Sequence, residues 1–317
     1  MKRLVQIFVS LMLAGIVMYY LYHDFPFSDI SHILTHSIDW IWVIAAMGMG
    51  AAAQLFRALR WQLLLKPFGT SVSVRNLAGA VFTSFALSLL IPRIGEISRC
   101  ATLRKTNDIS FSRSIGTVVT ERIADTLTLL ALIGAVFCRQ WNTVDVFFAP
   151  QHANSSNSGN LTIAIVLAIS IGVIVVSGIW ALRKNKKFRS QYSKFKEGLL
   201  SVAHCGHPWL FTFYSMLICL FNLLNLWLMF YAFPFTAHLG ADAALLAFCM
   251  IAFAMVIPTP NGAGPWHYVV MTSLIIYGVG RTDASTFALI VHALHMLTII
   301  LLGFAGMAML RKYKPTH

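Results

Sequence analysis

Three charged residues follow a proline inside an otherwise apolar stretch of the chain. They are Arg93, Glu96 and Arg99, just after Pro92. If a helix resumes after the proline, Glu96 and Arg99 lie three residues apart on one face. The surplus charge is positive, arginine presents a planar fork that suits phosphate, and the N–H groups of the new helix point at the break. We therefore predict an anion-binding site; the alternative is an ion-pair network that only fixes the local fold.

A second charged group lies on the next apolar stretch. Glu121 and Asp125 share a helical face, and Arg122 lies within reach of Asp125. One arginine between two acids favours a structural brace, which supplies counterions for the first group, over a direct substrate contact. A carboxylate left incompletely paired would instead serve a proton relay.

A second Pro/Gly-rich run interrupts another apolar stretch, and histidines follow it. The candidate residues of this break are Pro258, Pro260, Asn261, Gly262 and Gly264. His267 lies just past them, and His292 and His295 lie on the last apolar stretch. Imidazoles bind phosphate, carry protons or hydrogen-bond in a core, so a functional role and a structural one are both open. No metal-ligand spacing such as HExxH occurs, and we predict no metal site.

Arg57 and Arg60 precede Trp61 at the end of an early apolar stretch. Arginine and tryptophan at a membrane interface are ordinary anchors, and this interpretation comes first. The two arginines also stay among the candidate substrate-binding residues, because they could steer an anionic headgroup toward the first break.

The chain that positions these residues has the composition of an all-α integral membrane protein. Of its 317 residues 58% are hydrophobic and 11% charged, and the mean hydropathy is +0.73. Soluble domains carry roughly 25% charged residues. The five cysteines are odd in number and lack metal-ligand spacing, so we predict no disulfide framework.

Six stretches are long enough to cross a bilayer, which takes about 20 apolar residues. They are 4–22, 38–58, 114–137, 161–182, 208–232 and 285–310. Two shorter stretches each run into one of the breaks and continue beyond it, which predicts re-entrant hairpins at 76–105 and 243–279. A broken helix is tolerated at membrane depth only where protein or a water-filled cavity covers it. The alternative is eight plain spans with proline kinks.

The basic residues fix a membrane topology. With both termini in the cytoplasm, all of the 24 Lys and Arg except Arg139 and Arg281 fall on that side or in the first hairpin and its adjoining span. The net charge of +13 therefore reflects topology, and we expect no nucleic-acid partner. The basic segment 183–207 predicts an interfacial helix or a solvated connector. The halves, 1–153 and 154–317, each contain three spans and a hairpin, so the second is inverted.

Interrupted helices at matching positions of two inverted repeats are typical of transporters, with the substrate bound where the breaks meet. We expect the partner to be a lipid with an anionic headgroup, either a phospholipid or a polyprenyl-phosphate-linked lipid. No ATP-binding motif is visible and no cofactor is expected, so a gradient of the lipid or of an ion would drive movement. A membrane-embedded transferase acting on polyprenyl-phosphate and an accessory scaffold are the alternatives. We do not favour an enzyme, because no Asp-x-Asp metal motif or nucleotide fold is visible. A homo-oligomer is left open.

Four motifs, in this order, resemble the lysylphosphatidylglycerol synthase transmembrane family. They stand here as Arg57-x-x-Arg60-Trp61, Pro92-Arg93-x-Gly95-Glu96-x-x-Arg99, Glu121-Arg122-x-x-Asp125 and Pro258-x-Pro260-x-Gly262-x-Gly264. The resemblance implies a flippase-like, multi-pass protein of the bacterial inner membrane, similar to the lipid-flipping half of the multiple peptide resistance factor without its aminoacyl-transferase domain. The family usually has a glutamate three residues after the last glycine, where this chain has His267.

Overall fold

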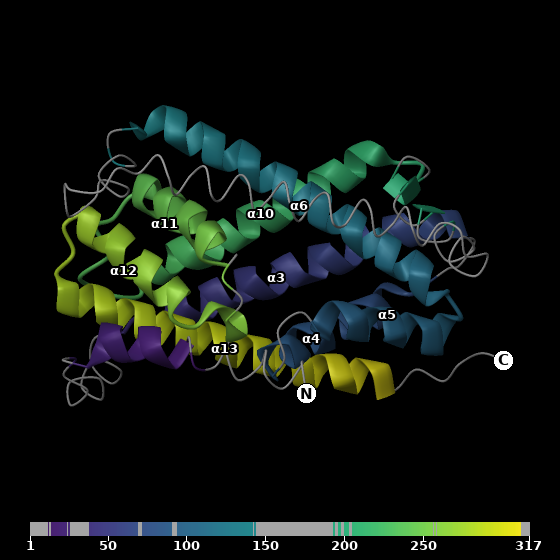
Figure 1. Ribbon diagram of the computed structural model, residues 1–317, viewed down its shortest axis with the longest axis horizontal. Helices are drawn as coiled ribbons and strands as arrows, with labels where there is room; N and C mark the ends of the chain where they lie inside the picture. Colours follow the sequence, from purple (N-terminus) through teal and green to yellow (C-terminus); the bar gives the residue numbers. More distant parts are fainter. Residues whose placement is uncertain are drawn as a thin grey trace.

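The structure is a computed structural model, and its described part is all-helical (Figure 1). It describes residues 12, 14–23, 25, 38–68, 72–90, 94–141, 143, 193, 196–197, 200–202, 205–255, 257 and 259–311. The α-helices are α3 (Trp40–Leu65), α4 (Val74–Leu90), α5 (Ile94–Asn107), α6 (Phe111–Arg139), α10 (Pro208–Tyr231), α11 (Ala241–Ala254), α12 (Pro265–Ile276) and α13 (Arg281–Arg311). Short 3-10 turns are η2 (Lys66–Phe68), η3 (Leu200–Val202) and η4 (Pro260–Gly262). The predicted span 161–182 lies outside the described residues, as does most of the basic segment 183–207.

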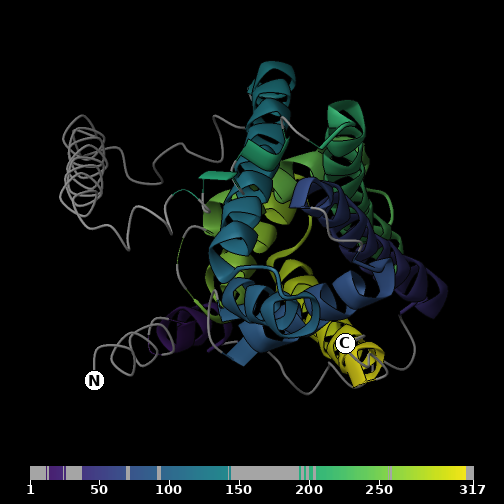
Figure 2. The same cartoon turned by 90° about the vertical axis from the view of Figure 1, so that its right-hand side faces the viewer.

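The long helices run along the long axis of the molecule (Figures 1 and 2). Helix α3 packs along α10, and α13 packs along α4. Among the described residues, three helical stretches are long and apolar enough to cross a membrane: Trp40–Phe68, Pro208–Tyr231 and Arg281–Arg311. Helix α6 has a similar length of 29 residues but carries charged residues in its middle. The helices expected around 38–58, 114–137, 208–232 and 285–310 are therefore all present.

Helices α4 and α5 form the first predicted hairpin. Its two ends are joined at the base, where Asn76 Nδ2 donates to Asn107 Oδ1 over 2.8 Å and to Thr106 Oγ1 over 3.2 Å. Near the break, a Cβ added to Gly95 would lie 2.1 Å from the carbonyl oxygen of Ser84. Only glycine lets the start of α5 approach α4 so closely. Residues 91–93 at the tip lie outside the described residues.

Helices α11 and α12 form the second predicted hairpin, with the break between them. Gln140 closes its base, because its Oε1 accepts from the Tyr277 hydroxyl over 2.9 Å and its Nε2 donates to the Asp242 carbonyl over 3.2 Å. Within the break Asn261 has a φ of 48°, in the left-handed region. Asparagine tolerates this conformation better than most residues do. Both helix interruptions thus occur where the sequence predicts them.

The core and the surface divide as they do in a membrane protein. Phe287 of α13 packs edge-on against Phe230 and Phe233, with ring centroids 5.4 Å and 5.3 Å apart. Large apolar side chains such as Ile41 and Trp209 are instead exposed. An apolar surface of this extent marks contact with lipid or with another protein.

Candidate functional site

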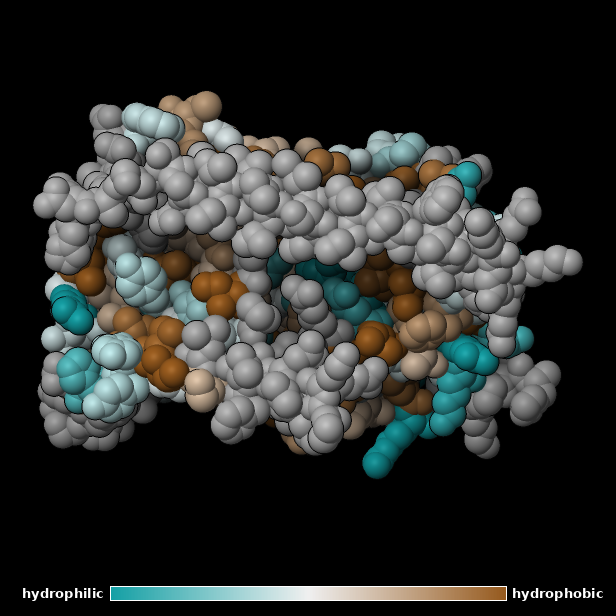
Figure 3. All heavy atoms as spheres, in the orientation of Figure 1, coloured by the Kyte–Doolittle hydropathy of each residue, from teal (hydrophilic) through white to brown (hydrophobic). Residues whose placement is uncertain are grey.

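Helices α4 and α5 of the first hairpin and the second helix break line one cavity of about 220 Å³. The first hairpin contributes Gly95, Glu96 and Arg99, α6 contributes Arg122, and the second break contributes Thr259, Asn261 and Gly262. Figure 3 shows hydrophilic residues deep in a hollow in the middle of one face, with hydrophobic residues around them. The sequence predicts that the two breaks meet; the described residues bring the start of α5 and the second break together, and residues 91–93 of the first break lie outside them.

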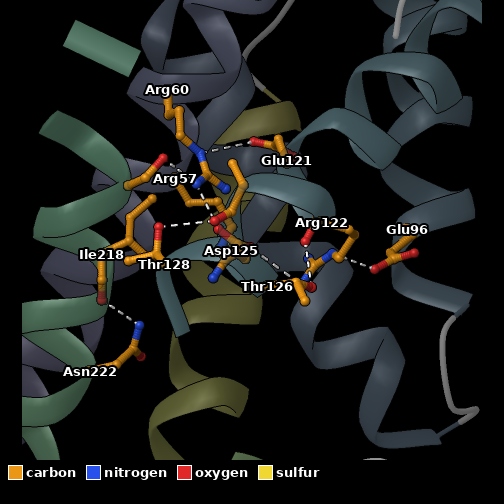
Figure 4. A network of polar contacts seen from close by, with 12 residues as sticks. Arg57, Arg60, Glu96, Glu121, Arg122, Asp125, Thr126, Thr128, Ile218 and Asn222 are labelled. Carbon is orange, nitrogen blue, oxygen red and sulfur yellow. Dashed lines mark hydrogen bonds and ion pairs between the residues drawn. The ribbon is translucent and has the colours of Figure 1, made fainter. Parts of the chain in front are cut away.

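A network of arginines and acids lies beside the cavity (Figure 4). Asp125 accepts from Arg60 over 2.6 Å and from Arg57 over 2.9 Å, and Glu121 accepts from Arg99 over 2.6 Å. Arg60 and Glu121 are fully buried, and Arg99 is 2% exposed. Buried charges are tolerated where they are paired with one another. Glu121 and Asp125 are therefore the counterions that the sequence suggests.

The interpretation of Arg57 and Arg60 as interfacial anchors is wrong. Their exposed fractions are 8% and 0%, and Arg60 also donates to Ser215 Oγ of α10 over 2.8 Å. Neither arginine lines the cavity. Both lie on the face of α3 that meets α6, so the two acids of α6 hold them inside the protein. Their candidate role in substrate binding is therefore indirect in this structure.

Glu96 and Arg122 form a pair of a different kind, since both are about half exposed. Their Oε1 and Nε atoms are 2.8 Å apart, and their side chains are 42% and 44% exposed. The sequence groups Glu96 with Arg99 on one helical face. The structure instead pairs each with a residue of α6, Glu96 with Arg122 and Arg99 with Glu121. Arg122 is thus more than a brace, because it reaches the cavity.

Several buried polar atoms at the cavity wall have no hydrogen-bond partner among the described residues. They are Thr259 Oγ1, Asn261 Nδ2 and Arg99 Nε. Buried polar groups nearly always have partners, so water or a ligand in the cavity would complete the hydrogen bonds of these three atoms. Thr259 is only 5% exposed. Sequence reasoning missed it because it considered the flanking prolines only as helix breakers.

The other candidate residues of the breaks lie around this wall or beyond the described residues. Pro260 begins η4, Gly262 is buried at the cavity, and Gly264 directly precedes α12. Arg93 and Pro258 lie outside the described residues, so their roles stay predictions.

The histidines lie on the far side of the second break. The rings of His267 and His292 have centroids 4.5 Å apart, and His292 Nε2 lies 3.2 Å from the carbonyl oxygen of Asn261. His267 Nδ1 accepts the backbone N–H of Gly264 over 3.3 Å. His292 and His295 line a second cavity of about 220 Å³, and Asn261 lines both cavities. The second break therefore separates two neighbouring cavities. One is lined by the charged residues Glu96, Arg99 and Arg122, and the other by uncharged residues and the two histidines.

Comparison with known proteins identifies the family. A model of the lysylphosphatidylglycerol synthase TM region matches residues 7–303, which is most of the chain. The chain belongs to this family. It is thus a multi-pass membrane protein, and the resemblance carried by the four motifs is confirmed. The matched region is the transmembrane part of the synthase, and here the family's first three motifs as they stand in this chain build the ion-pair network.

Two relatives of this family member come from the archaeon Methanocaldococcus jannaschii. UPF0104 membrane protein MJ1078 is 24% identical over 221 residues, which cover 69% of this chain and 91% of the relative. UPF0104 membrane protein MJ1595 is 22% identical over 292 residues, which cover 86% of this chain and 85% of the relative. No solved structure matches the chain.

Proposed function

We propose that the protein is a flippase, which moves a lipid with a phosphate-bearing headgroup between the leaflets of the bacterial inner membrane. The observation that carries this proposal is the cavity where the two helix breaks meet, with Arg99 and Arg122 on one side and Thr259 and Asn261 on the other. Membership of the lysylphosphatidylglycerol synthase transmembrane family supports it.

The chemistry of the cavity suits a phosphate. Arg122 is half exposed there, and guanidinium groups bind phosphate through two parallel hydrogen bonds. Thr259 Oγ1 and Asn261 Nδ2 add a hydroxyl and an amide that have no other partner among the described residues. At about 220 Å³ the cavity is smaller than pockets that enclose drug-sized ligands. It fits a headgroup, while the acyl or prenyl chains stay in the bilayer.

The packing of the helices supports two inverted repeats with re-entrant hairpins. Helix α4 packs on α13 as α11 packs on α6, and α5 packs on α6 as α12 packs on α13, while α3 and α10 pack on each other. If each helix of the first half is exchanged with its counterpart in the second (α3 with α10, α4 with α11, α5 with α12, α6 with α13), these same pairs of helices are in contact. In this arrangement, one repeat rocks against the other and opens the cavity to each leaflet in turn.

Ion pairs support the assigned sidedness. Arg113 at the start of α6 pairs with Glu197 over 2.8 Å, and both belong to the proposed cytoplasmic side. Arg139 at the end of α6 pairs with Asp242 over 3.1 Å, and both belong to the proposed external side. Each pair joins residues that the proposed topology puts on one side, and the distribution of Lys and Arg is the basis on which we place both chain termini in the cytoplasm.

A reconstituted flipping assay tests the proposed function. Acyl-labelled phosphatidylglycerol in proteoliposomes should become accessible to an external quencher with the wild-type protein. Arg122→Gln should slow this about tenfold, because it removes a charge-assisted hydrogen bond to phosphate. Arg113→Gln is the matched control, since it breaks a half-exposed ion pair on the same helix away from the cavity. Wild-type protein that moves the label no faster than protein-free liposomes do would contradict the proposal.

A further inference from the structure

The cavity wall carries an acid, which a site for a purely anionic headgroup would not need. Glu96 is the one carboxylate among the described residues that line the cavity, and its side chain is 42% exposed. A bound phosphate with no positive group of its own would face this carboxylate as a like charge, which disfavours binding. The wall therefore has a feature that the proposed anion site leaves unexplained.

The pair between Glu96 and Arg122 can open at low cost. Arg122 Nη1 also lies 3.6 Å from Asp125 Oδ2, so the guanidinium keeps an acidic neighbour when Glu96 leaves it. Among the described residues, Glu96 has Arg122 as its one ion-pair partner, and its side chain is half exposed. A half-exposed pair of this kind contributes little stability. A ligand can therefore replace Glu96 as the partner of Arg122, and Arg122 as the partner of Glu96.

The charges beneath the wall are unequal. Among the described residues of the network, Arg57, Arg60 and Arg99 face two acids, Glu121 and Asp125. Arg99 also lines the cavity, so this surplus of one positive charge reaches the wall, where Glu96 and Arg122 form their pair. The site thus offers a positive and a negative region within reach of one small headgroup.

We propose that the headgroup is zwitterionic, with a primary ammonium next to its phosphate, as in phosphoethanolamine. This inference rests on the proposed flippase function. The phosphate replaces Glu96 on Arg122, beside Arg99, and the ammonium, two carbons away, pairs with the released Glu96 carboxylate. Thr259 and Asn261 hydrogen-bond the phosphate from the opposite side.

Lipids that differ only in the headgroup test the inference in the flipping assay. Acyl-labelled phosphatidylethanolamine should move about fivefold faster than phosphatidylglycerol, the size of effect that a half-exposed ion pair produces. It should outpace N-acetyl-phosphatidylethanolamine by the same factor, because acetylation removes the ammonium charge. This comparison needs only the wild-type protein and so does not depend on the folding of a variant.

Variants and a soluble probe complete the experiment. Glu96→Gln should bring the ratio of ethanolamine to glycerol lipid transport close to one, whereas Glu197→Gln, at an exposed pair outside the cavity, should leave the ratio as in the wild type. Radiolabelled free phosphoethanolamine should stay outside the proteoliposomes.

The outcomes separate the two proposals. Equal rates for the three lipids in the wild type would overturn the zwitterionic headgroup and leave the flippase standing, as would accumulation of free phosphoethanolamine without lipid discrimination. If no lipid moves at all, both proposals fall.

Discussion

His267 stands at the position where the resemblance to the family implies a glutamate, and it makes the bond that a glutamate there would make. In a capping box, the side chain of a glutamate at N3, three residues after the N-cap, accepts the backbone N–H of the N-cap residue. Here the Nδ1 of His267 accepts the N–H of Gly264 at the start of α12. A ring nitrogen that accepts a hydrogen bond carries no proton, whereas the imidazolium carries a proton on both nitrogens. The bond to Gly264 therefore requires the neutral imidazole with its proton on Nε2.

We predict that transport depends on pH through this histidine. Imidazole titrates near pH ~6.5 in water. Protonation would break the bond to Gly264 and set a positive charge against the ring of His292, 4.5 Å away. Because burial, the bond to Gly264 and the nearby His292 all favour the neutral ring, transport should stay constant near neutral pH and fall only at a pH well below the value at which a free imidazole titrates. His267→Gln keeps a hydrogen-bond acceptor and should flatten the profile in the flipping assay.

One control and two further substitutions accompany this measurement. His207→Gln changes an exposed histidine before α10 and should keep the wild-type profile. Tyr22 and Trp266 are the other rings against His267, and neither changes charge in this pH range. His292 and His295 need the same substitution, because they line the adjoining cavity. Identical profiles for the wild type and His267→Gln would make His267 a purely structural cap.

The sequence identifies most of the charged residues of the site but not how they pair. Spacing along one helix shows that Glu96 and Arg99 are neighbours, whereas their partners lie on α6 and depend on how two helices cross. The same limit explains Arg57 and Arg60: an arginine near the end of a span has the same local pattern whether it faces headgroups or a buried acid. Thr259 carries no signal of its own, since only burial without a partner distinguishes it.

At the scale of elements, the helix breaks could be predicted because proline and glycine act locally. Helix pairs occur where the hairpins are predicted at 76–105 and 243–279, as α4–α5 and α11–α12, displaced by a few residues at their ends, and their re-entrant placement stays a proposal. The hydrogen bonds that close the second hairpin could not be predicted, because Gln140 follows α6 and lies outside that hairpin. Each hairpin therefore has a base that can be loosened separately.

We predict that Gln140→Ala loosens the second hairpin alone. The substitution removes two hydrogen bonds and leaves the Tyr277 hydroxyl without its partner, which costs about 1–3 kcal/mol. Amide hydrogen exchange should speed up in α11 and α12 and stay unchanged in α4 and α5. Asn76→Ala is the reciprocal control and should affect only the first hairpin. Faster exchange in both hairpins with either variant would contradict independent closure.

At the scale of the whole molecule, the topology follows from simple counting of charges, and the packing of the halves does not. The positive-inside rule assigns the ends of the spans before any contact is known. Which helix of one half meets which helix of the other depends on three-dimensional packing, as in the contact of α3 with α10. The predicted inverted repeats thus rest on both kinds of observation and remain a proposal.

Cysteine labelling in intact cells tests the topology. In a background without the five native cysteines, single cysteines at the exposed positions His238, Gly240, Arg281 and Thr282 should react with an impermeant maleimide. Cysteines at Lys105 and Lys187 should react only after the cells are opened, because both lie on the proposed cytoplasmic side. Labelling at position 187 from outside would contradict the inverted arrangement, and a labelled Lys105→Cys would contradict the first half of it.

The buried ion pairs also set an order of events during synthesis. Arg57 pairs with Asp125, 68 residues further along the chain. A ribosome adding 5–20 residues per second makes the acid roughly 3–14 s after the arginine. Until then α3 carries two arginines without their partners, and an unpaired arginine costs up to about 2.5–3.5 kcal/mol in a bilayer, the most at its centre. We therefore expect α3 to wait beside the insertion machinery, and to be released into lipid only together with α6.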